Sequence, residues 1–394
     1  MSTISVLDLA SHTNPYSHYR WHLSQADLRF DVTSQCWIAA KAEVVQGILN
    51  SHQFLVRPAS SKVPSNIVGS SAGEVFSYLI RMNEGSEHAL GKRVLQTNLQ
   101  QLGEASFDQA VLDVLHSFSQ IYTLKKLDDI NLWLNHFSVS VMARLCGFPV
   151  SDLVQVSLWI DDFVKCLSAL STKEQLRGAS IAAECLLDSF QALLNSAQAS
   201  SESFLNRLQE EAKEHGWESS RALRSNLIGL LSQTYEASSG LIANSLIAMH
   251  QYPKLREELH QDRAQLSAFI GEVARWDPSV QNTRRFVAED CELAGVRLRA
   301  GDTILLLLAA ANRDPNANPE AEKFDLRRHS PRLMSFSHGR HQCPGQDLAY
   351  RMSWAALNHL LDRVNEDFWI NLNWQYRPSA NGRLPVFLTP SQEQ

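Results

Sequence analysis

The sequence predicts a mainly α-helical protein with small β-sheets, and three observations support this fold class. Over residues 72–270, apolar side chains recur three and four positions apart, as they do on one face of an amphipathic helix. After Trp276 the pattern changes to short apolar runs separated by glycine and aspartate, which is typical of short strands and tight turns. Beyond Pro344 the helical spacing returns, so a small sheet is expected between two helical parts.

The individual elements follow from this periodicity. The strongest helical segments are residues 153–167, 181–194 and 223–250. Strands are expected within residues 285–298 and over residues 303–308, where β-branched and other apolar residues lie between Gly and Asp turns.

The longest stretch without periodicity is residues 312–343, which contains three prolines. Long irregular segments inside a compact protein usually serve its function. A helix follows Pro344, and the chain closes with a β-like tail at residues 374–388. No repeat, low-complexity tract or flexible linker interrupts the sequence, which predicts a single domain over residues 1–394.

Composition and charge exclude several classes of protein. The 394 residues carry 36 Lys+Arg against 42 Asp+Glu, a formal net charge of −6, whereas a nucleic-acid surface normally needs a basic excess. The longest apolar stretch, residues 304–311, is far shorter than the about 20 residues of a membrane-spanning helix, and no signal-peptide pattern opens the chain. Six scattered cysteines without a C-x-x-C pair are typical of a reducing compartment. We therefore expect a soluble, cytoplasmic protein without nucleic-acid or membrane partners.

Cys343 stands at the end of the irregular segment, in the run FSHGRHQCPG at residues 336–345. A cysteine that leads directly into a helix lies at the positive end of the helix dipole, which stabilises a thiolate as a metal ligand or nucleophile. Pro344 fits this position, because proline is tolerated in the first turn of a helix. On these local facts two alternatives remain: a buried cysteine beside a turn, and a zinc site formed by His338, His341 and Cys343.

The run F-x-x-G-x-x-x-C-x-G resembles the haem-binding loop of the cytochrome P450 family of haem-thiolate enzymes. Glu272 and Arg275 are similar to the E-x-x-R motif of that family, and residues 324–328 are similar to the segment that supplies a second arginine, Arg328, to a buried ion-pair triad. Shorter motifs of the family follow in the expected order at residues 14–16, 147–149 and 311–315. The resemblance therefore extends over nearly the whole chain.

This resemblance implies a single-domain cytochrome P450 fold of the soluble bacterial type, with haem b between a long central helix and the helix that follows Cys343. The Cys343 thiolate would be the axial ligand of the iron, and the triad of Glu272, Arg275 and Arg328 would hold the loop in place. The family positions that contact the haem fall on His88, Lys92, Arg285, Phe336, Gly339, His341 and Gly345. Lys92 stands where the family usually has arginine, which keeps the charge but loses bidentate geometry.

Residues 230–245 are similar to the long central helix of the family, whose signature is A-G-x-[DE]-T. Glu236 keeps the acid of this signature, but Ala237 replaces the threonine and Thr234 replaces the glycine. Ser238 is rotated by about 100° round the helix from Ala237, so it does not simply replace the missing hydroxyl. These four residues are the candidate catalytic residues. Either Thr234 or a polar group of the substrate would complete a proton relay with Glu236.

The resemblance also indicates where a substrate would bind. Four residues are expected in the substrate pocket: Val280, Gln281, Asn282 and Ala380. Further walls of the pocket are expected from residues 60–75, 163–170 and 379–382. Gln281 and Asn282 are polar, so they would either hydrogen-bond the substrate or cap the ends of strands.

The function implied by the resemblance is that of a haem-thiolate monooxygenase. It would oxidise a small organic substrate, in secondary-metabolite biosynthesis, with dioxygen and with electrons from a separate ferredoxin and an NAD(P)H-dependent ferredoxin reductase. The missing threonine keeps two enzymatic alternatives open: an oxidase that forms C–C or C–O bonds without oxygen insertion, and a peroxide-driven enzyme. The alternative of a different class is a non-catalytic haem protein.

Overall fold

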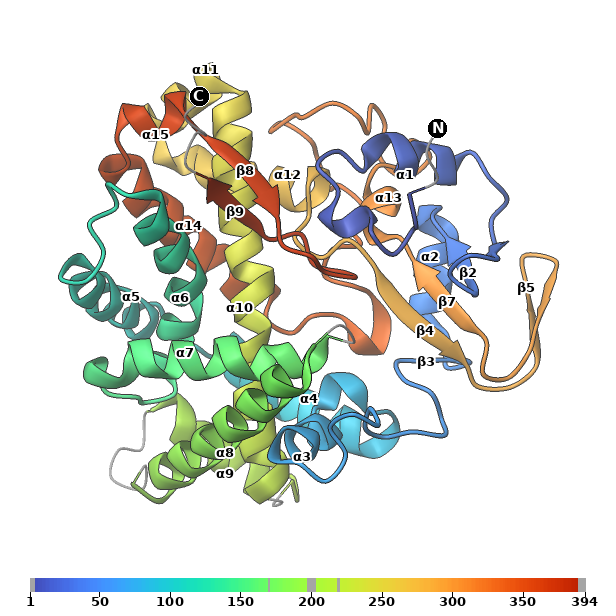
Figure 1. Ribbon diagram of the computed structural model, residues 1–394, viewed down its shortest axis with the longest axis horizontal. Coiled ribbons are helices and arrows are strands. Elements are labelled where there is room, and N and C mark those ends of the chain that lie inside the picture. The colour runs from blue at the N-terminus through green and yellow to red at the C-terminus, as the bar shows by residue number, and fades with distance from the viewer. Residues whose placement is uncertain (1–3, 169–170, 197–202, 218–219, 389–394) are drawn as a thin grey trace. The chain divides into compact units, whose positions relative to one another are not determined.

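The computed structural model describes residues 4–168, 171–196, 203–217 and 220–388. Helices outweigh strands in these residues (Figure 1). The predicted fold class, mainly α-helical with small sheets, is therefore confirmed. No helix in this part of the chain combines the length and the hydropathy that crossing a membrane requires.

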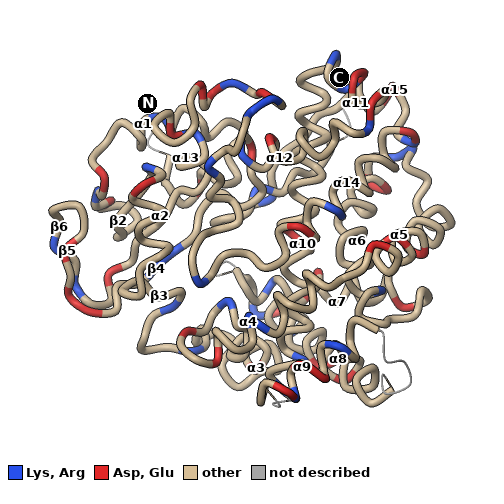
Figure 2. Tube along the Cα trace, turned by 180° about the vertical axis from the view of Figure 1, so that it is seen from behind, with Lys and Arg blue, Asp and Glu red and all other residues tan. Residues whose placement is uncertain are grey.

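Contacts divide the chain into two compact units. The first consists of Met1–Ser60, Gly240–Gln346 and Ser353–Gln394, and the second of Ser61–Ser239 and Asp347–Met352. The single domain expected over residues 1–394 stays a prediction. Figure 2 shows basic and acidic residues interspersed along the traced chain rather than separated by sign.

The described part of the second unit is helical. Its elements before the long helix α10 are α3 (Ser71–Tyr78), η2 (Ile80–Met82), α4 (Gly85–Gln100), α5 (Glu104–Ser119), α6 (Leu127–Leu145), η3 (Val150–Asp152), α7 (Leu153–Val164), η4 (Lys165–Leu167), α8 (Lys173–Ser196) and α9 (Phe204–Glu214). Helix α6 packs on α5 and α7, α8 packs on α3 and α7, and α4 packs on α9. Nearly every residue of α6 from Trp133 onward is buried, so α6 forms much of the core of this unit.

Helix α10 (Ser220–Gln251) runs over 32 residues and contributes to both units. Figure 1 shows it as the long yellow helix. It contains the helical segment predicted at residues 223–250. The segments predicted at residues 153–167 and 181–194 lie in α7 with η4 and in α8, so all three helix predictions are confirmed.

A five-stranded sheet with the order β1-β2-β7-β4-β3 belongs to the first unit. Its strands are β1 (Arg29–Asp31), β2 (Cys36–Ala39), β3 (Phe54–Leu55), β4 (Thr283–Val287) and β7 (Thr303–Leu306). Strands β2 and β7 are parallel, and the other neighbouring pairs are antiparallel. Strands β1, β2 and β3 were not predicted from the sequence, because strands of two to four residues are too short to show an alternating pattern.

The remaining strands form two hairpins, β5 (Cys291–Leu293) with β6 (Val296–Leu298) and β8 (Asn373–Tyr376) with β9 (Pro385–Leu388). The second hairpin confirms the β-like tail. The strand predicted over residues 303–308 is wrong at its end, because β7 stops at Leu306 and α13 (Leu308–Asn312) begins two residues later. Alanine has the highest helix propensity, and residues 309–311 are three alanines.

The remaining helical elements of the first unit are η1 (Leu9–Ser11), α1 (Tyr16–Leu23), α2 (Ala42–Asn50), α11 (Pro253–Gln261), η6 (Arg263–Gln265), α12 (Leu266–Trp276), η7 (Gly339–His341), α14 (Gln346–Arg363), which also enters the second unit, and α15 (Glu366–Ile370).

Strand β7 is buried on both faces between these helices. Ile304 and Leu306 belong to a core cluster with Ile48 of α2, whereas Leu305 belongs to a second cluster with Tyr19 of α1. Alternate residues of a strand face opposite sides of a sheet, which explains the continuous apolar run.

Candidate functional site

Cys343 lies in the turn between η7 and α14. Its backbone N–H donates to the carbonyl oxygen of Phe336 at 2.8 Å, which closes the loop just before α14 begins at Gln346. The Cys343 side chain is exposed, whereas burial raises the pKa of the Cys166 thiol to about 12 and also raises that of Cys146. An exposed sulfur just before the amino end of an 18-residue helix is accessible to a metal.

Arg340 anchors this loop to the elements at its back. Its guanidinium donates to the carbonyl oxygen of Ser51 at 2.6 Å and to that of Phe54 at 2.8 Å. The loop is therefore attached to the end of α2 and to β3. Arg340 was not predicted from the sequence, because its partners are main-chain atoms almost 300 positions away and leave no motif in the sequence.

Gly339 approaches the end of α2 too closely for a side chain. Its φ is +66°, and a β-carbon there would lie 2.7 Å from Asn50 Oδ1 and 2.9 Å from the carbonyl oxygen of Leu49. We expect Gly339→Ala to lower the free energy of unfolding by about 1–3 kcal/mol, because a non-glycine residue is strained in this conformation. Gly271→Ala on α12 is the control, since no atom lies within 4 Å of its β-carbon position. Equal losses for the two variants in urea titrations would contradict this prediction.

Glu272 and Arg275 of α12 form a buried bidentate ion pair. Arg275 Nε donates to Glu272 Oε2 at 2.8 Å and Nη2 donates to Oε1 at 2.7 Å, and the exposed fractions of the Arg275 and Glu272 side chains are 0% and 3%. Arg328 approaches the same carboxylate, with its Nε 3.5 Å from Glu272 Oε1. The three residues that the resemblance grouped as a triad thus lie in contact.

The triad also binds the backbone of the irregular segment. Arg275 donates to the carbonyl oxygens of Asn312, Ala321 and Lys323. Arg328 donates to those of Pro319, Glu320 and Lys323. Glu272 Oε1 accepts the backbone N–H of Asp325 at 3.0 Å. These bonds hold residues 319–325 in one conformation without regular secondary structure.

The donor set around Cys343 fits a metal that brings most of its own ligands. Within the described ranges, no group of three or more His, Cys, Asp or Glu side chains is placed to hold a metal ion. The alternative of a zinc site at His338, His341 and Cys343 is therefore excluded, and His338 Nε2 instead lies 3.1 Å from the carbonyl oxygen of Leu333. A single exposed sulfur, with Gly345 leaving room beside it, fits the iron of a haem, to which the protein needs to supply only an axial ligand.

The other residues expected at the haem are distributed over both units. In the first, Arg285 of β4 is 4% exposed and donates to the carbonyl oxygen of Arg284 at 2.8 Å, while Phe336 and His341 are half-buried. In the second, His88 and Lys92 stand one turn apart on α4, and His88 is buried. Their contacts with haem stay predictions.

Around Glu236, helix α10 carries an accessible stripe within residues 225–249, which are otherwise buried. Gln233 and Glu236 are exposed, and Thr234 and Ala237 are half-buried. Residues spaced three and four apart share one face of a helix, so these four side chains border the same space. Ser238 is only 3% exposed and faces away from the stripe, which agrees with its expected rotation.

Two of the expected pocket residues are bonded within the first unit. Gln281 is 0% exposed, its Oε1 accepts from the Tyr19 hydroxyl at 2.8 Å, and its Nε2 donates to the carbonyl oxygen of Pro278 at 2.6 Å. Asn282 is buried as well and donates to the carbonyl oxygen of Ala380 at 2.8 Å. These bonds favour the alternative that both amides cap strand ends.

The other expected walls differ in their exposure. Val280 is half-buried and Ala380 is exposed, so their contact with a substrate stays a prediction. Phe163 is 0% exposed and does not line a pocket, because it packs into the core of the second unit. Residues 169–170 lie outside the described residues.

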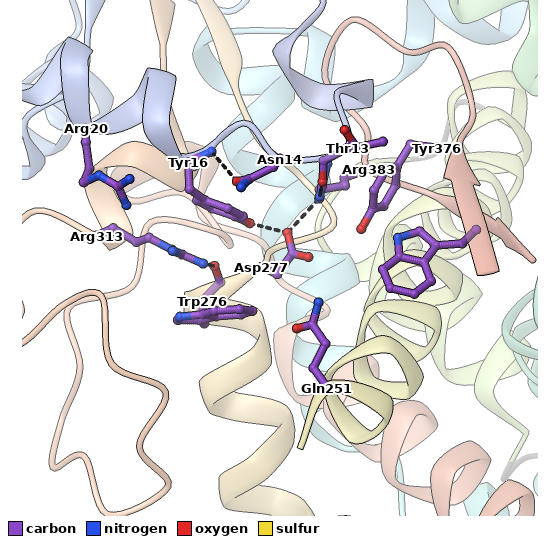
Figure 3. A pocket seen from close by; sticks show the side chains of 11 residues that line it. Thr13, Asn14, Tyr16, Arg20, Gln251, Trp276, Asp277, Arg313, Tyr376 and Arg383 are labelled. Carbon is purple, nitrogen blue, oxygen red and sulfur yellow. Dashed lines mark hydrogen bonds and ion pairs between the residues drawn. The ribbon is translucent and has the colours of Figure 1, made fainter. Parts of the chain in front are cut away.

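The first unit contains a cavity of 310 Å³ that was not predicted from the sequence, and Figure 3 shows the side chains that line it. Asp277 is at its centre and accepts hydrogen bonds from the Tyr16 hydroxyl and from Arg383 Nε, the latter at 2.7 Å. Arg383 also donates to the carbonyl oxygens of His12 and Thr13. Burial, followed by the charge of Asp277, raises the pKa of Tyr16. These groups satisfy one another, so the network joins the N-terminal segment to the β8–β9 hairpin region.

Comparisons with known proteins agree with these features. The sequence profile of the family described as Cytochrome P450 matches residues 183–365. The chain is 26% identical over 286 residues to the biotin biosynthesis cytochrome P450 of Bacillus subtilis, which covers 71% of this chain and 72% of the relative. It is 32% identical over 247 residues to putative cytochrome P450 133B2 of Xylella fastidiosa, covering 61% of this chain and 62% of that relative. The crystal structure of P450BioI with an acyl carrier protein that carries hexadec-9Z-enoic acid has a TM-score of 0.78, at 24% identity, over 95% of this chain and 97% of that chain.

Proposed function

Since this chain belongs to the cytochrome P450 superfamily, whose members are haem-thiolate monooxygenases, we propose that it oxidises a small organic substrate of secondary metabolism in the cytoplasm. Electrons would come from a separate ferredoxin and its NAD(P)H-dependent reductase. The single observation that carries the proposal is the exposed Cys343 sulfur at the amino end of α14, in a loop anchored by Arg340. Bound there, haem supplies the activation of dioxygen, which an electron-rich thiolate ligand favours.

Several residues of the chain would hold the haem. Cys343 would supply the thiolate, and Phe336 and Gly339 would shape the loop around it. The haem propionates would be bound by Arg285, His341, His88 and Lys92. The arginine and the lysine carry a positive charge, and each histidine can donate a ring N–H or carry a charge when protonated. Gly345 would leave room beside the sulfur, and a β-carbon there would lie 4.0 Å from it.

Proton delivery depends on the accessible stripe of α10. Glu236 supplies an acid, and Ala237 supplies no hydroxyl. The Thr234 hydroxyl donates its proton to the carbonyl oxygen of Leu231 at 2.7 Å, so this proton is already engaged within the helix. Ser238 faces the core of the protein. We therefore propose that a polar group of the substrate completes the relay with Glu236.

The relay can be tested with two variants and a substrate that shifts the Soret band of the holoenzyme. Thr234→Ala is expected to leave the product formed per NAD(P)H consumed within about twofold, because the threonine proton is not available to the relay. Ala237→Thr is expected to lower this ratio, because the added side chain occupies the place of the substrate group. If Thr234→Ala uncouples turnover and Ala237→Thr restores it, the protein itself builds the relay.

The source of electrons needs its own assay. Turnover with a surrogate ferredoxin and ferredoxin reductase is expected to exceed turnover with hydrogen peroxide. The peroxide-driven alternative has one observation in its favour, since Ala237 and the engaged Thr234 hydroxyl weaken proton delivery to dioxygen. A product yield that depends on peroxide and not on NAD(P)H would replace the proposal by that alternative. Product without an inserted oxygen atom would favour the oxidase.

A further inference from the structure

Arg81 belongs to the short helical turn η2, which the second unit holds rigidly against α10. The backbone N–H of Ile80 donates to Asn226 Oδ1 at 2.9 Å, and Asn226 Nδ2 donates to the carbonyl oxygen of Tyr78 at 2.8 Å. A β-carbon at Gly229 would lie 2.9 Å from a methyl carbon of Leu79, so the turn also packs closely on the helix. The backbone that carries Arg81 is therefore held in place against α10.

The same face of α10 continues from this turn to the candidate catalytic acid. Positions 226, 229, 233 and 236 are three, four and three residues apart, which places them along one face of the helix. Asn226 and Gly229 contact η2, and the residue at position 236 is Glu236. The Arg81 guanidinium interacts electrostatically with Glu236 and with Cys166 of η4. Arg81 therefore lies within electrostatic range of the accessible stripe that carries Glu236, Thr234 and Ala237.

The guanidinium of Arg81 has one buried donor that the protein does not use. Its Nε is buried without a hydrogen-bond partner within the described residues, and its electrostatic interactions there are with Glu236 and Cys166. Burial lowers the pKa of Arg81 from its ordinary value, while Glu236 and Cys166 act in the opposite direction. A buried donor without a partner destabilises the folded protein, and more so when it carries a charge. The residue as a whole is only half-buried, so a ligand can reach it.

We propose that Arg81 binds a carboxylate group of the substrate and so orients the substrate beside Glu236. This inference rests on the proposed monooxygenase function and defines its substrate class. A carboxylate accepts two parallel N–H bonds from one guanidinium, which would satisfy the buried Nε and one terminal nitrogen. An alcohol or amide would leave part of this donor set unsatisfied. A phosphate dianion is less favourable than a carboxylate, because Glu236 already places one negative charge nearby.

This assignment also accounts for the missing threonine of the central helix. A substrate held by Arg81 would place a charged oxygen group next to Glu236, where the relay needs a hydrogen-bonding group and Ala237 has none. The carboxylate would then have two roles, binding to Arg81 and ordering the water or acid that delivers protons. A substrate joined to an acyl carrier protein by its carboxyl group has no free carboxylate and would not bind in this way.

Binding to the holoenzyme tests the inference. The probes are octanoic, dodecanoic and 3-phenylpropanoic acids, the amide of each, and dodecyl phosphate, and dissociation constants are measured by calorimetry and by the Soret shift. The wild type is expected to bind at least one acid more tightly than its amide, and Arg81→Met to weaken that acid by about 10- to 100-fold while leaving the amide unchanged. Arg81→Lys should lose less affinity, because it keeps the charge. Arg177→Met on α8, an exposed arginine of the same unit, is the matched control and should change neither constant.

Three outcomes would overturn the inference. The first is that no acid binds more tightly than its amide, and the second is that Arg81→Met weakens acid and amide equally. The third is that dodecyl phosphate binds more tightly than dodecanoic acid, which would replace the carboxylate by a phosphate. A normal thiolate spectrum of reduced Arg81→Met with carbon monoxide shows that the variant folds and binds haem. Failure of the proposed function would instead appear in the wild type, as the absence of that spectrum.

Discussion

Replacing Cys343 by serine is expected to abolish the thiolate Soret band of the reduced, carbon-monoxide-bound protein and to reduce turnover to background. Only a deprotonated sulfur donates enough electron density to give this band and to favour cleavage of the O–O bond. The protein itself should stay folded, because the Cys343 side chain is exposed and contributes nothing to either core cluster. The measurement is the difference spectrum with carbon monoxide, together with circular dichroism.

The control for this substitution is Cys185→Ser on α8. Cys185 is partly exposed, whereas Cys343 is exposed, and it lies in the middle of a helix, where no loop or helix terminus supports a thiolate. Its replacement should leave the spectrum, haem content and turnover unchanged. A thiolate band that survives Cys343→Ser would show that another residue binds the iron and would remove the basis of the proposed function.

Glu272→Ala is expected to cost about 3–5 kcal/mol of stability and to yield little haem-loaded protein. The substitution leaves Arg275, whose side chain is 0% exposed, without its bidentate carboxylate. It also removes the acceptor of the Asp325 backbone N–H, so the segment before the cysteine loop loses an anchor. Yield, haem per protein chain and the urea midpoint measure the effect.

Two neighbouring arginines provide graded controls for the triad. The Arg327 side chain is 86% exposed, so Arg327→Ala should be nearly neutral. The loss of stability in Arg328→Ala should lie between the losses in Glu272→Ala and Arg327→Ala. Arg328 Nε has no hydrogen bond to Glu272, but its terminal nitrogens donate to three backbone carbonyls. Normal yield and haem content of Glu272→Ala would mean that the triad does not hold the loop.

Local features of the sequence predicted much of the fold. Helical periodicity located α7, α8 and α10, because the hydrophobic face of a helix repeats within a few residues and can be read without knowing its partners. The cysteine loop was equally clear, since its glycine, cysteine and proline occupy adjacent positions with distinct backbone requirements. Strands β1, β2 and β3 were missed, because so few residues carry no pattern of their own.

Some residues of the candidate site were predicted from the sequence, and others became evident only in the structure. Resemblance identified Glu272, Arg275 and Arg328, and their contacts are present in the structure. It did not identify Arg340 or Arg81. An arginine in a sequence is most often a solvated surface residue. Only the burial and the hydrogen-bond partners of Arg340 and Arg81 in the structure distinguish these two residues from surface arginines.

By itself, the sequence determined the fold class, the helices and the position of the cysteine loop, because these depend on residues that are near one another in the chain. Only the tertiary structure decided which polar groups are already satisfied. The Gln281 side chain meets Tyr19 across 262 positions, and Asp277 meets Tyr16 across 261, so neither amide nor carboxylate is available to a substrate. The same folding leaves the buried Nε of Arg81 without a hydrogen-bond partner among the described residues. Hydrogen bonding inside a protein is a matter of distance in space, which sequence separation does not reveal.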